Sequence, residues 1–270
     1  IAVSRGLGDV YKRQALGTVC DAVPLKGLNR ILVNKGLEVM QKFNNPGLRA
    51  LAEKSNIKHK VSVYDLGFKL GPRINAAGRL GRSSFGTDLL TASEKLKADQ
   101  ISEELNKFNS ERRTIESYVL DQAIEQVTKQ KLNNKVLIVY GEGWHEGVIG
   151  IIASRLKDKF NKPTIVFAIT DDVAKGSGRS LKGIDLGSLV VAAQQSQIIL
   201  KGGGHAMAAG LTMEKNKIDE LSQFIEKRLK KVDEIQSNFS TMLADDKLSI
   251  SAVNLEVYNE IEKVGPFGSE

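Results

Sequence analysis

The amino-acid sequence predicts an α/β protein organised as two modest domains, and three observations support this prediction. The chain has 270 residues, which suits two domains better than one. Residues 135–168 read as a strand, a helix and a strand in succession, which is an order typical of an α/β domain. Residues 89–131 contain no Pro or Gly and repeat apolar side chains at helical spacing, and long helices this polar often bridge two domains.

The N-terminal part of the chain divides into three segments. Residues 1–14 show no clean period, so they stay unassigned, and a non-native origin is left open for them. Residues 15–20 read as a buried strand that ends at Asp21, a usual place for a catalytic carboxylate in α/β proteins. Residues 29–40 predict a helix, because their apolar side chains recur at helical spacing.

The second half of the chain contains five further predicted elements: strands 135–140 and 163–168, and helices 147–160, 184–194 and 217–230. The tail from Val232 is acidic and does not close a domain by itself. It ends abruptly at residues 265–270, from which we expect a truncated domain.

Composition excludes several classes of protein. The single cysteine, Cys20, excludes an internal disulfide and fits a reducing compartment. No apolar run approaches the length of about 18 residues that a membrane span requires. The N-terminus lacks the apolar core and the cleavage site of a secretory signal. We therefore expect a cytoplasmic protein that does not bind membranes.

The formal net charge of +7 is unevenly distributed. Residues 15–86 carry 12 basic and 4 acidic side chains, a balance of +8, and residues 134–230 carry 14 and 10, a balance of +4. Two basic regions can line a groove for a polyanion. The alternative is that scattered lysines only solvate the surface.

The segment from Lys201 to Gly210 places three consecutive glycines before a histidine. Glycines let backbone amides turn toward an anion and let a polymer approach the main chain. His205 can bond a phosphate oxygen or share a proton. The spacing matches neither a Walker loop nor a dinucleotide-binding fingerprint. The string therefore predicts phosphate handling, with a glycine-rich hairpin that carries a surface histidine as the alternative.

Residues 71–82 concentrate three arginines, Arg73, Arg79 and Arg82, with Asn75 and no acidic residue. Guanidinium groups bind phosphate through two parallel hydrogen bonds. Small residues between the arginines keep the backbone close to whatever they hold. A purely structural role needs carboxylate partners, and the segment supplies none, so we expect a binding function.

Residues 175–180 suggest a second anion pocket. Ser177 and Arg179 alternate with glycine, so an extended segment places both on one face. A plain turn is the alternative.

Four other side chains have open interpretations. Asp21 suits a divalent metal, but one aspartate cannot hold a catalytic ion, so a turn aspartate is the alternative. Trp144 is expected in packing rather than in base stacking. His145 stays undecided, and His59, which lies between two lysines, is expected at the surface.

Taken together, five strings resemble the RecJ family of single-strand-DNA-specific exonucleases within the DHH phosphoesterase superfamily. They are LGTVCDAVPL, LGPRINAAGRLG, GWHEGVIGIIASRL, GSGRS and GGGHAMAAG, in that order between residues 15 and 210. The tail through VGPFG also looks like this family.

The resemblance implies a fold and a domain order. Residues 15–86 would end a DHH-type core lobe, 87–133 would form the connecting helix, and 134–230 would form the α/β DHH-associated domain. Residues 231–270 would begin a barrel of the oligonucleotide/oligosaccharide-binding (OB) type. The Asp-His-His motif that names the superfamily is absent, so the resemblance implies a fragment with an incomplete metal site and no activity of its own.

The resemblance also implies an activity: 5′-to-3′ degradation of single-stranded DNA to mononucleotides with Mn²⁺ or Mg²⁺, in recombination and repair. It implies a monomer whose partners include a helicase and a single-strand-binding protein. The implied site residues are Asp21, as both a catalytic residue and a metal ligand; catalytic residues Arg73, Asn75, Arg79 and His205; and substrate-binding residues Ser177, Arg179, Gly202, Gly203 and Gly204. The arginine cluster adds Arg82 as a further substrate-binding candidate. Of these, Ser177 and Arg179 would hold the 5′-phosphate end.

Two alternatives stay open. One is a phosphodiesterase of the same superfamily that acts on short oligonucleotides or cyclic dinucleotides. The other is a single-strand-binding module with no catalysis.

Overall fold

The computed structural model describes residues 2–129, 134–229 and 244–268, which divide into two compact units. The first unit contains the chain up to Glu111 together with the residues from Ala244 onward. The second unit begins at Arg112. The division falls within one long helix, and the predicted domain boundaries at 86 and 134 stay a prediction.

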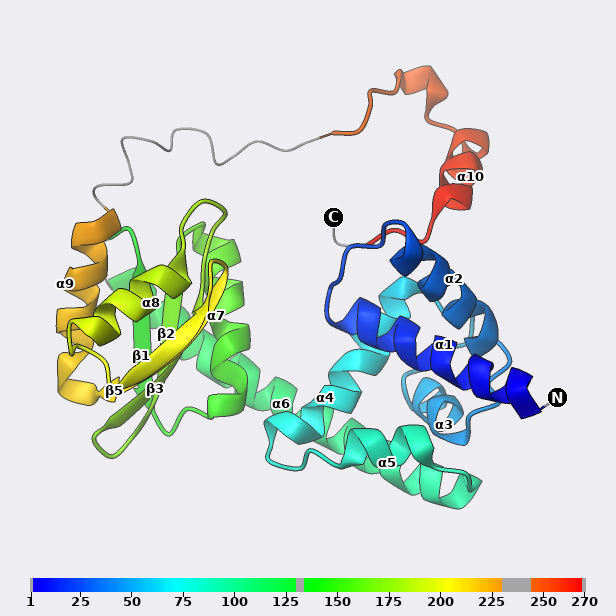
Figure 1. The fold of residues 1–270 in the computed structure, drawn as a ribbon, viewed down its shortest axis with the longest axis horizontal. Helices are drawn as coiled ribbons and strands as arrows, with labels where there is room; N and C mark the ends of the chain where they lie inside the picture. The colour runs from blue at the N-terminus through cyan, green and yellow to red at the C-terminus, as the bar shows by residue number, and fades with distance from the viewer. Residues whose placement is uncertain (1, 130–133, 230–243, 269–270) are drawn as a thin grey trace. The chain divides into compact units, whose positions relative to one another are not determined.

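The first unit is helical (Figure 1). Its elements before the long helix are α1 (Ala2–Cys20), α2 (Leu28–Met40), α3 (Pro46–Lys54), the π-helix η1 (Asp65–Leu70), α4 (Gly71–Arg79) and α5 (Phe85–Thr91). Their apolar faces meet in one core, whose fully buried members include Leu51, Leu66 and Leu89. Gly36 lets α1 and α2 touch, because a Cβ at this position would collide with Ala15.

The strand predicted at residues 15–20 is wrong, because these residues form the last turns of α1. The buried side chains Lys12, Ala15 and Leu16 are spaced by three and four residues, which is the helical period. A window of six residues with β-branched members cannot separate a buried strand from a buried helix. The residues before Ala15, which the sequence does not assign, belong to the same helix from Ala2 onward.

Other predictions for this half of the chain agree better with the structure. The helix predicted at 29–40 is confirmed as α2. The long helix is confirmed as α6 (Lys95–Lys129), but the predicted stretch is interrupted after α5. Ala92 takes an extended conformation there, with ψ of 126°, which ends α5.

The second unit is a five-stranded sheet in the order β1-β2-β3-β5-β4. The strands are β1 (Leu137–Glu142), β2 (Thr164–Thr170), β3 (Val173–Arg179), β4 (Lys201–His205) and β5 (Ala208–Glu214). Strands β1 and β2 are parallel, and the other neighbouring pairs are antiparallel. The helices are α7 (Glu146–Phe160), α8 (Leu186–Gln195) and α9 (Ile218–Leu229), together with the end of α6.

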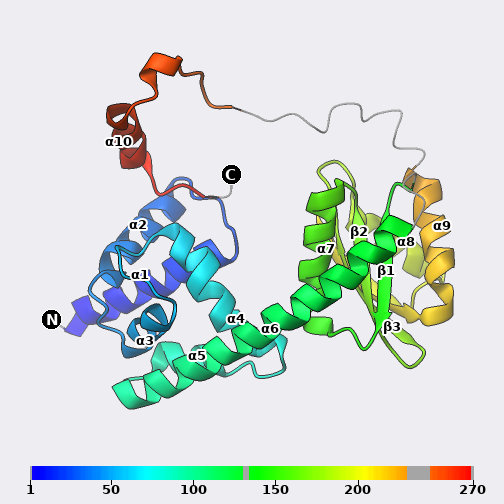
Figure 2. The same cartoon turned by 180° about the vertical axis from the view of Figure 1, so that it is seen from behind.

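Helices cover the two faces of this sheet unequally (Figures 1 and 2). On one face, α8 and α9 bury a core that includes Phe167 and Met213. On the other face, α6 and α7 bury side chains of β1 and β2, such as Val139 and Val166. The residues of β4 and β5 on this second face stay exposed or half-buried.

All five elements predicted for this half of the chain are present, with their ends shifted by one or two residues. Residue 230 of the last predicted helix lies outside the described residues.

The tail does not confirm the predicted start of an OB-type barrel. Its described part, residues 244–268, contains a short 3₁₀ turn (Ile250–Ala252) and α10 (Leu255–Val264), and no strand. Residues 231–243 of the predicted barrel lie outside the described ranges. Within those ranges, no helix is both long and apolar enough to cross a bilayer.

Candidate nucleic-acid interface

The register of three strands brings polar residues from distant parts of the chain onto one sheet surface. Directly paired residues on β3, β5 and β4 point to the same side, and side chains two positions apart share that side. Three rows result, which we call the open face: Arg179–Ala208–His205, Ser177–Gly210–Gly203 and Lys175–Thr212–Lys201. The strands' other side chains, such as Ala209 and Leu211, face the core under α8 and α9.

Two glycines leave the middle row of the open face bare. A Cβ at Gly203 would meet nothing within 4 Å, and one at Gly210 would meet only the carbonyl of Gly176 at 4.0 Å. Neither glycine has a positive φ, so neither packing nor backbone conformation requires glycine there. The missing side chains keep the backbone open to an approaching ligand.

The other two glycines of the predicted run have a packing role. A Cβ at Gly202 would lie 2.6 Å from Cγ1 of Val190 in α8, and one at Gly204 would collide with the carbonyl of Ala208. Of the three glycines predicted to bind substrate, only Gly203 lies on the open face.

Ser177 and Arg179 lie on the same side of β3, as the alternation predicts. Arg179 Nη1 donates to Ser177 Oγ at 3.3 Å and to the carbonyl of Gly178 at 2.8 Å. A Cβ at Gly150 of α7 would lie 3.1 Å from Ser177 Oγ and 3.2 Å from Arg179 Nη2. Glycine at position 150 therefore lets the serine and the arginine lie against the helix backbone, where the guanidinium is half-buried.

His205 ends β4 at the turn of the β4–β5 hairpin and is exposed. Its Nδ1 accepts a hydrogen bond from the backbone N–H of Met207 at 3.3 Å. A neutral imidazole that accepts at Nδ1 carries its proton on Nε2, which can then donate to a phosphate oxygen. The segment therefore forms the glycine-rich hairpin with a surface histidine that was the alternative interpretation. The same hairpin also presents the bare glycines on which the phosphate-binding interpretation depends.

The predicted residues of the first unit form a separate group around α1 and α4. Cys20 ends α1, and a Cβ at Gly71, the first residue of α4, would collide with its Sγ. Asp21 follows Cys20, so it lies close to the start of α4, and its side chain is exposed. Among the described residues, no group of three or more His, Cys, Asp or Glu side chains could hold a metal ion.

The two arginines of α4 differ: Arg73 has structural contacts, and Arg79 is exposed. Arg73 is half-buried, and its guanidinium donates to Asn106 Oδ1 of α6 at 3.1 Å and to the carbonyl of Lys69 at 2.8 Å. The absence of nearby carboxylates therefore did not exclude a structural role, because amide and carbonyl oxygens supply it. Asn75 and Arg79 lie four residues apart on one face of α4 and are exposed.

Arg82 follows α4, and its guanidinium lies 5.4 Å from the ring centroid of Phe108, a cation–π distance.

The remaining predicted side chains have mainly structural contacts. Trp144 is buried as expected, and its Nε1 donates to Gln122 Oε1 at 2.7 Å. His145 caps α7, with its Nδ1 accepting from Gly147 N at 3.0 Å. His59 is exposed as expected, although it also lies 3.6 Å from the buried carboxylate of Asp65.

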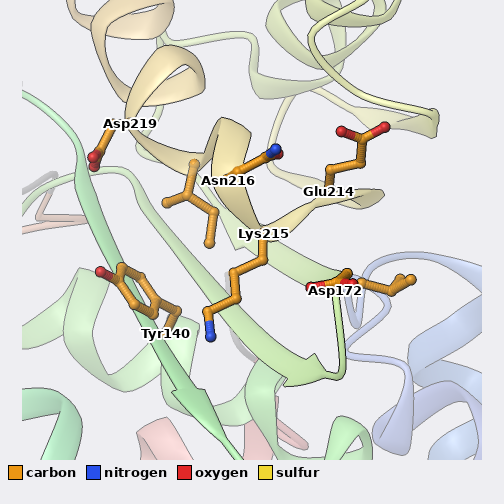
Figure 3. Close-up of a pocket in the computed structure, with 8 residues that line it drawn as sticks. Tyr140, Asp172, Glu214, Lys215, Asn216 and Asp219 are labelled. Carbon is orange, nitrogen blue, oxygen red and sulfur yellow. The ribbon is translucent and has the colours of Figure 1, made fainter.

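A cavity of about 830 Å³ lies beside the start of β3 and the end of β5, beyond the three rows of the open face (Figure 3). Tyr140, Lys215 and the acidic side chains of Asp172, Glu214 and Asp219 line it. None of the sequence-predicted site residues lies in it. Its acidic lining would repel a polyanion, so the open face is the better candidate interface.

Sequence reasoning missed Gly150, Lys175, Lys201, Gly210 and Thr212. The sequence contained a hint for two of them. Lys175 continues the alternation of Ser177 and Arg179, and Lys201 directly precedes the glycine run. Their joint position depends on strand register, which no single string contains.

The thiol of Cys20 offers a test of the α1–α4 junction. Burial raises the pKa of Cys20 from 9.0 to about 11, and the Asp21 carboxylate adds to the shift. The reactive thiolate is therefore scarce near neutral pH, so alkylation by iodoacetamide at pH 8 should be slower than in the urea-unfolded chain by up to about a hundredfold. The folded-state rate should still rise tenfold per pH unit between pH 9 and 10. Levelling of this rate near pH 9 would show that the junction is open, and Asp21→Asn should lower the pKa slightly.

The comparisons with known proteins identify relatives for almost the whole chain. A family model for the DHHA1 domain matches residues 133–231. The single-stranded-DNA-specific exonuclease RecJ of Dickeya dadantii (strain 3937) is 36% identical over 271 residues, which cover 97% of this chain and 47% of the relative. The protein of the same name from Escherichia coli (strain K12) is 35% identical with the same coverage. The chain thus spans about half the length of these curated relatives.

Solved structures agree with these relatives. The crystal structure of RecJ in complex with Mn²⁺ from Thermus thermophilus superposes with a TM-score of 0.86 at 28% identity, covering 97% of this chain and 38% of that one. The corresponding complex with Mg²⁺ gives a TM-score of 0.76 at 30% identity, covering 83% and 35%.

Proposed function

Because this chain belongs to the RecJ family, we propose that it supplies the strand-holding part of an exonuclease that degrades single-stranded DNA from its 5′ end. The proposed reaction hydrolyses phosphodiester bonds and releases mononucleotides, in recombination and repair. The proposed setting is the cytoplasm, with the protein acting as a monomer beside a helicase and a single-strand-binding protein.

The observation that carries this proposal is the bare middle row of the open face. Gly203 and Gly210 have room for side chains and no conformational need for glycine. Strand β4 is also the edge of the sheet, and an edge strand presents backbone N–H groups that no neighbour accepts. A phosphate can therefore approach both the glycine surface and the cations beside it. These features suit a flexible polyanion better than a small enclosed ligand.

In this proposal, Ser177 and Arg179 hold the terminal 5′-phosphate. The guanidinium already lies against Ser177 Oγ, so the two groups form a ready pair of donors. A terminal phosphate carries more charge and more free oxygens than an internal one, so the pair favours a free phosphorylated end. His205, with its proton on Nε2, donates to a phosphate oxygen of the same strand.

The α4 group holds the strand in the first unit. Asn75 and Arg79 share an exposed face and bind phosphate oxygens, as does Arg82 beside Phe108. Arg73 has a positioning role, because its hydrogen bonds to Asn106 of α6 and to the carbonyl of Lys69 in η1 fix the orientation of α4.

The described residues do not by themselves fit a divalent metal. The similar crystal structures contain Mn²⁺ and Mg²⁺, and use of one of these ions is part of the proposal. Asp21 is one exposed carboxylate in a region without a group of three potential ligands among the described residues. It stays a proposed single ligand, and no step of the reaction is derived through a metal.

The same observation favours a second candidate function for the described residues, namely single-strand binding without hydrolysis. Incubation of a labelled strand with the purified chain and Mn²⁺ separates the two, since only the exonuclease shortens the strand.

Two glycines of β4, Gly203 and Gly204, provide the test of the proposed function. Gly203→Ala should leave the fold intact and weaken single-stranded DNA binding about tenfold, because a methyl group would separate the phosphate from the backbone. Gly204→Ala should instead lower the thermal midpoint, because its Cβ would collide with Ala208. Fluorescence anisotropy and thermal unfolding measure the two effects.

Gly17→Ala is the matched control, since Gly17 in α1 also has nothing within 4 Å of its Cβ position. Unchanged DNA binding by Gly203→Ala would remove the open face from the proposed function.

A further inference from the structure

The open face continues beyond Ser177 and Arg179 into a third row of polar side chains. Lys175 of β3 pairs with Thr212 of β5, which in turn pairs with Lys201 of β4. This row follows the Ser177–Gly210–Gly203 row by two residues on each strand, so its side chains project from the same surface. A hydroxyl group thus lies between two lysines beside the bare glycine row.

The distance between the two rows matches the repeat of a nucleic-acid strand. Two residues of an extended strand advance by about 6.7 Å. They contain the same number of backbone bonds as one nucleotide repeat, counted from phosphorus to phosphorus. A strand that lies along the open face therefore places neighbouring phosphates on neighbouring rows.

The two lysines of this row are not equivalent. Lys175 Nζ lies 2.6 Å from Glu146 Oε1 at the start of α7, and both side chains are about half exposed. Lys201 is exposed and forms no ion pair with any described residue. Lys201 is therefore the principal cation available to a phosphate, whereas Glu146 partly neutralises Lys175.

The next row on the same surface carries the opposite charge. Val173 pairs with Glu214, so a carboxylate follows the two lysines at this end of the face. A phosphate on that row would be repelled, which limits the cationic surface to one position beyond the Ser177 row.

We propose that Lys201, with Thr212 and Lys175, forms a second phosphate subsite that holds the first internucleotide phosphate of a single strand whose terminal phosphate lies at Ser177 and Arg179. This proposal rests on the proposed function, because it takes the position of the terminal phosphate from it.

The experiment removes the charge of one phosphate and of one lysine, separately and together. The probes are 5′-phosphorylated single strands with a 3′ fluorophore, either unmodified or with a neutral methylphosphonate at the first internucleotide linkage. For the unaltered chain, this methylphosphonate should weaken binding about fivefold. Lys201→Ala should weaken binding of the unmodified strand by a similar factor. In the Lys201→Ala variant, the methylphosphonate should cause no further loss, because the two partners are coupled.

Two variants serve as controls. Lys227→Ala removes the same charge from α9, which covers the opposite face of the sheet, and should leave the methylphosphonate effect at about fivefold. Glu146→Gln should release Lys175 and tighten binding of the unmodified strand. Lys201→Ala should also reduce the dependence of log affinity on log salt by about 0.7, the value expected for one phosphate contact on a single strand.

A full additional loss in the Lys201→Ala variant would overturn the second subsite, since the losses would then be independent. The proposed function fails separately, if Gly203→Ala and Arg179→Ala bind all strands as the unaltered chain does. If those two variants weaken binding while Lys201→Ala behaves like Lys227→Ala, only the second subsite is wrong.

Discussion

Replacing Glu116 with alanine is expected to lower the free energy of unfolding by about 3 to 5 kcal/mol, the usual result of removing one partner of a buried ion pair. Glu116 is 4% exposed and pairs with Arg112 one turn earlier in α6, at 2.6 Å. It also pairs with Arg155 of α7. The variant leaves the guanidinium of Arg112, itself only 12% exposed, without its carboxylate. Urea denaturation measures the loss.

The matched control is Glu125→Ala on the same helix. Glu125 and Lys129 also lie four residues apart, but their side chains are 65% and 73% exposed. Solvent screens such a pair, so the loss should be small beside that of Glu116→Ala. Equal losses from the two variants would show that the Arg112–Glu116 pair does not contribute as a buried ion pair.

Replacing Arg179 with alanine is expected to abolish the preference for 5′-phosphorylated over 5′-hydroxyl strands. Hydrogen bonds to a charged group contribute about 1.5 to 3 kcal/mol, so affinity for the phosphorylated strand should fall roughly ten- to a hundredfold. The 5′-hydroxyl strand lacks that phosphate, so its affinity should change little. Anisotropy with 3′-labelled strands of both kinds measures the ratio.

Two further variants make this result specific. Arg179→Lys keeps the positive charge but loses the planar fork, so it should restore only part of the preference. Arg228→Ala removes an arginine that lies over the ring of Phe224 in α9, and the preference should persist. Equal losses on both strands would contradict the assignment of Arg179 to the terminal phosphate.

Parts of the fold were predictable because their local period is unambiguous. Helix α7 and its flanking strands β1 and β2 alternate long apolar runs with polar breaks, and all three are present. The prediction for residues 15–20 is wrong because their short apolar run fits both a strand and a helix. The deciding information is the continuation of the buried stripe to Lys12, in a segment whose own sequence shows no clean period.

For the candidate site as well, local patterns were predictable and contacts between distant residues were not. The alternation of Ser177 and Arg179 with glycine correctly predicted that the two side chains share one face. The acid-free composition around Arg73 favoured a binding role over a structural one, but the oxygens of Asn106 and Lys69 give this arginine structural partners without any carboxylate. Partner identity depends on packing between elements, which composition does not encode.

From local spacing and residue type, the sequence alone predicted the order of helices and strands in the second unit and the segments that we propose to bind phosphate. The family was indicated by the resemblance of five strings, not by spacing or composition. Only the tertiary structure decided that Gly203 faces open space while Gly202 and Gly204 face the core, and that Lys175, Thr212 and Lys201 form one row. The physical reason is strand register: the pleat assigns each residue to a face, and pairing between distant segments decides which residues become neighbours.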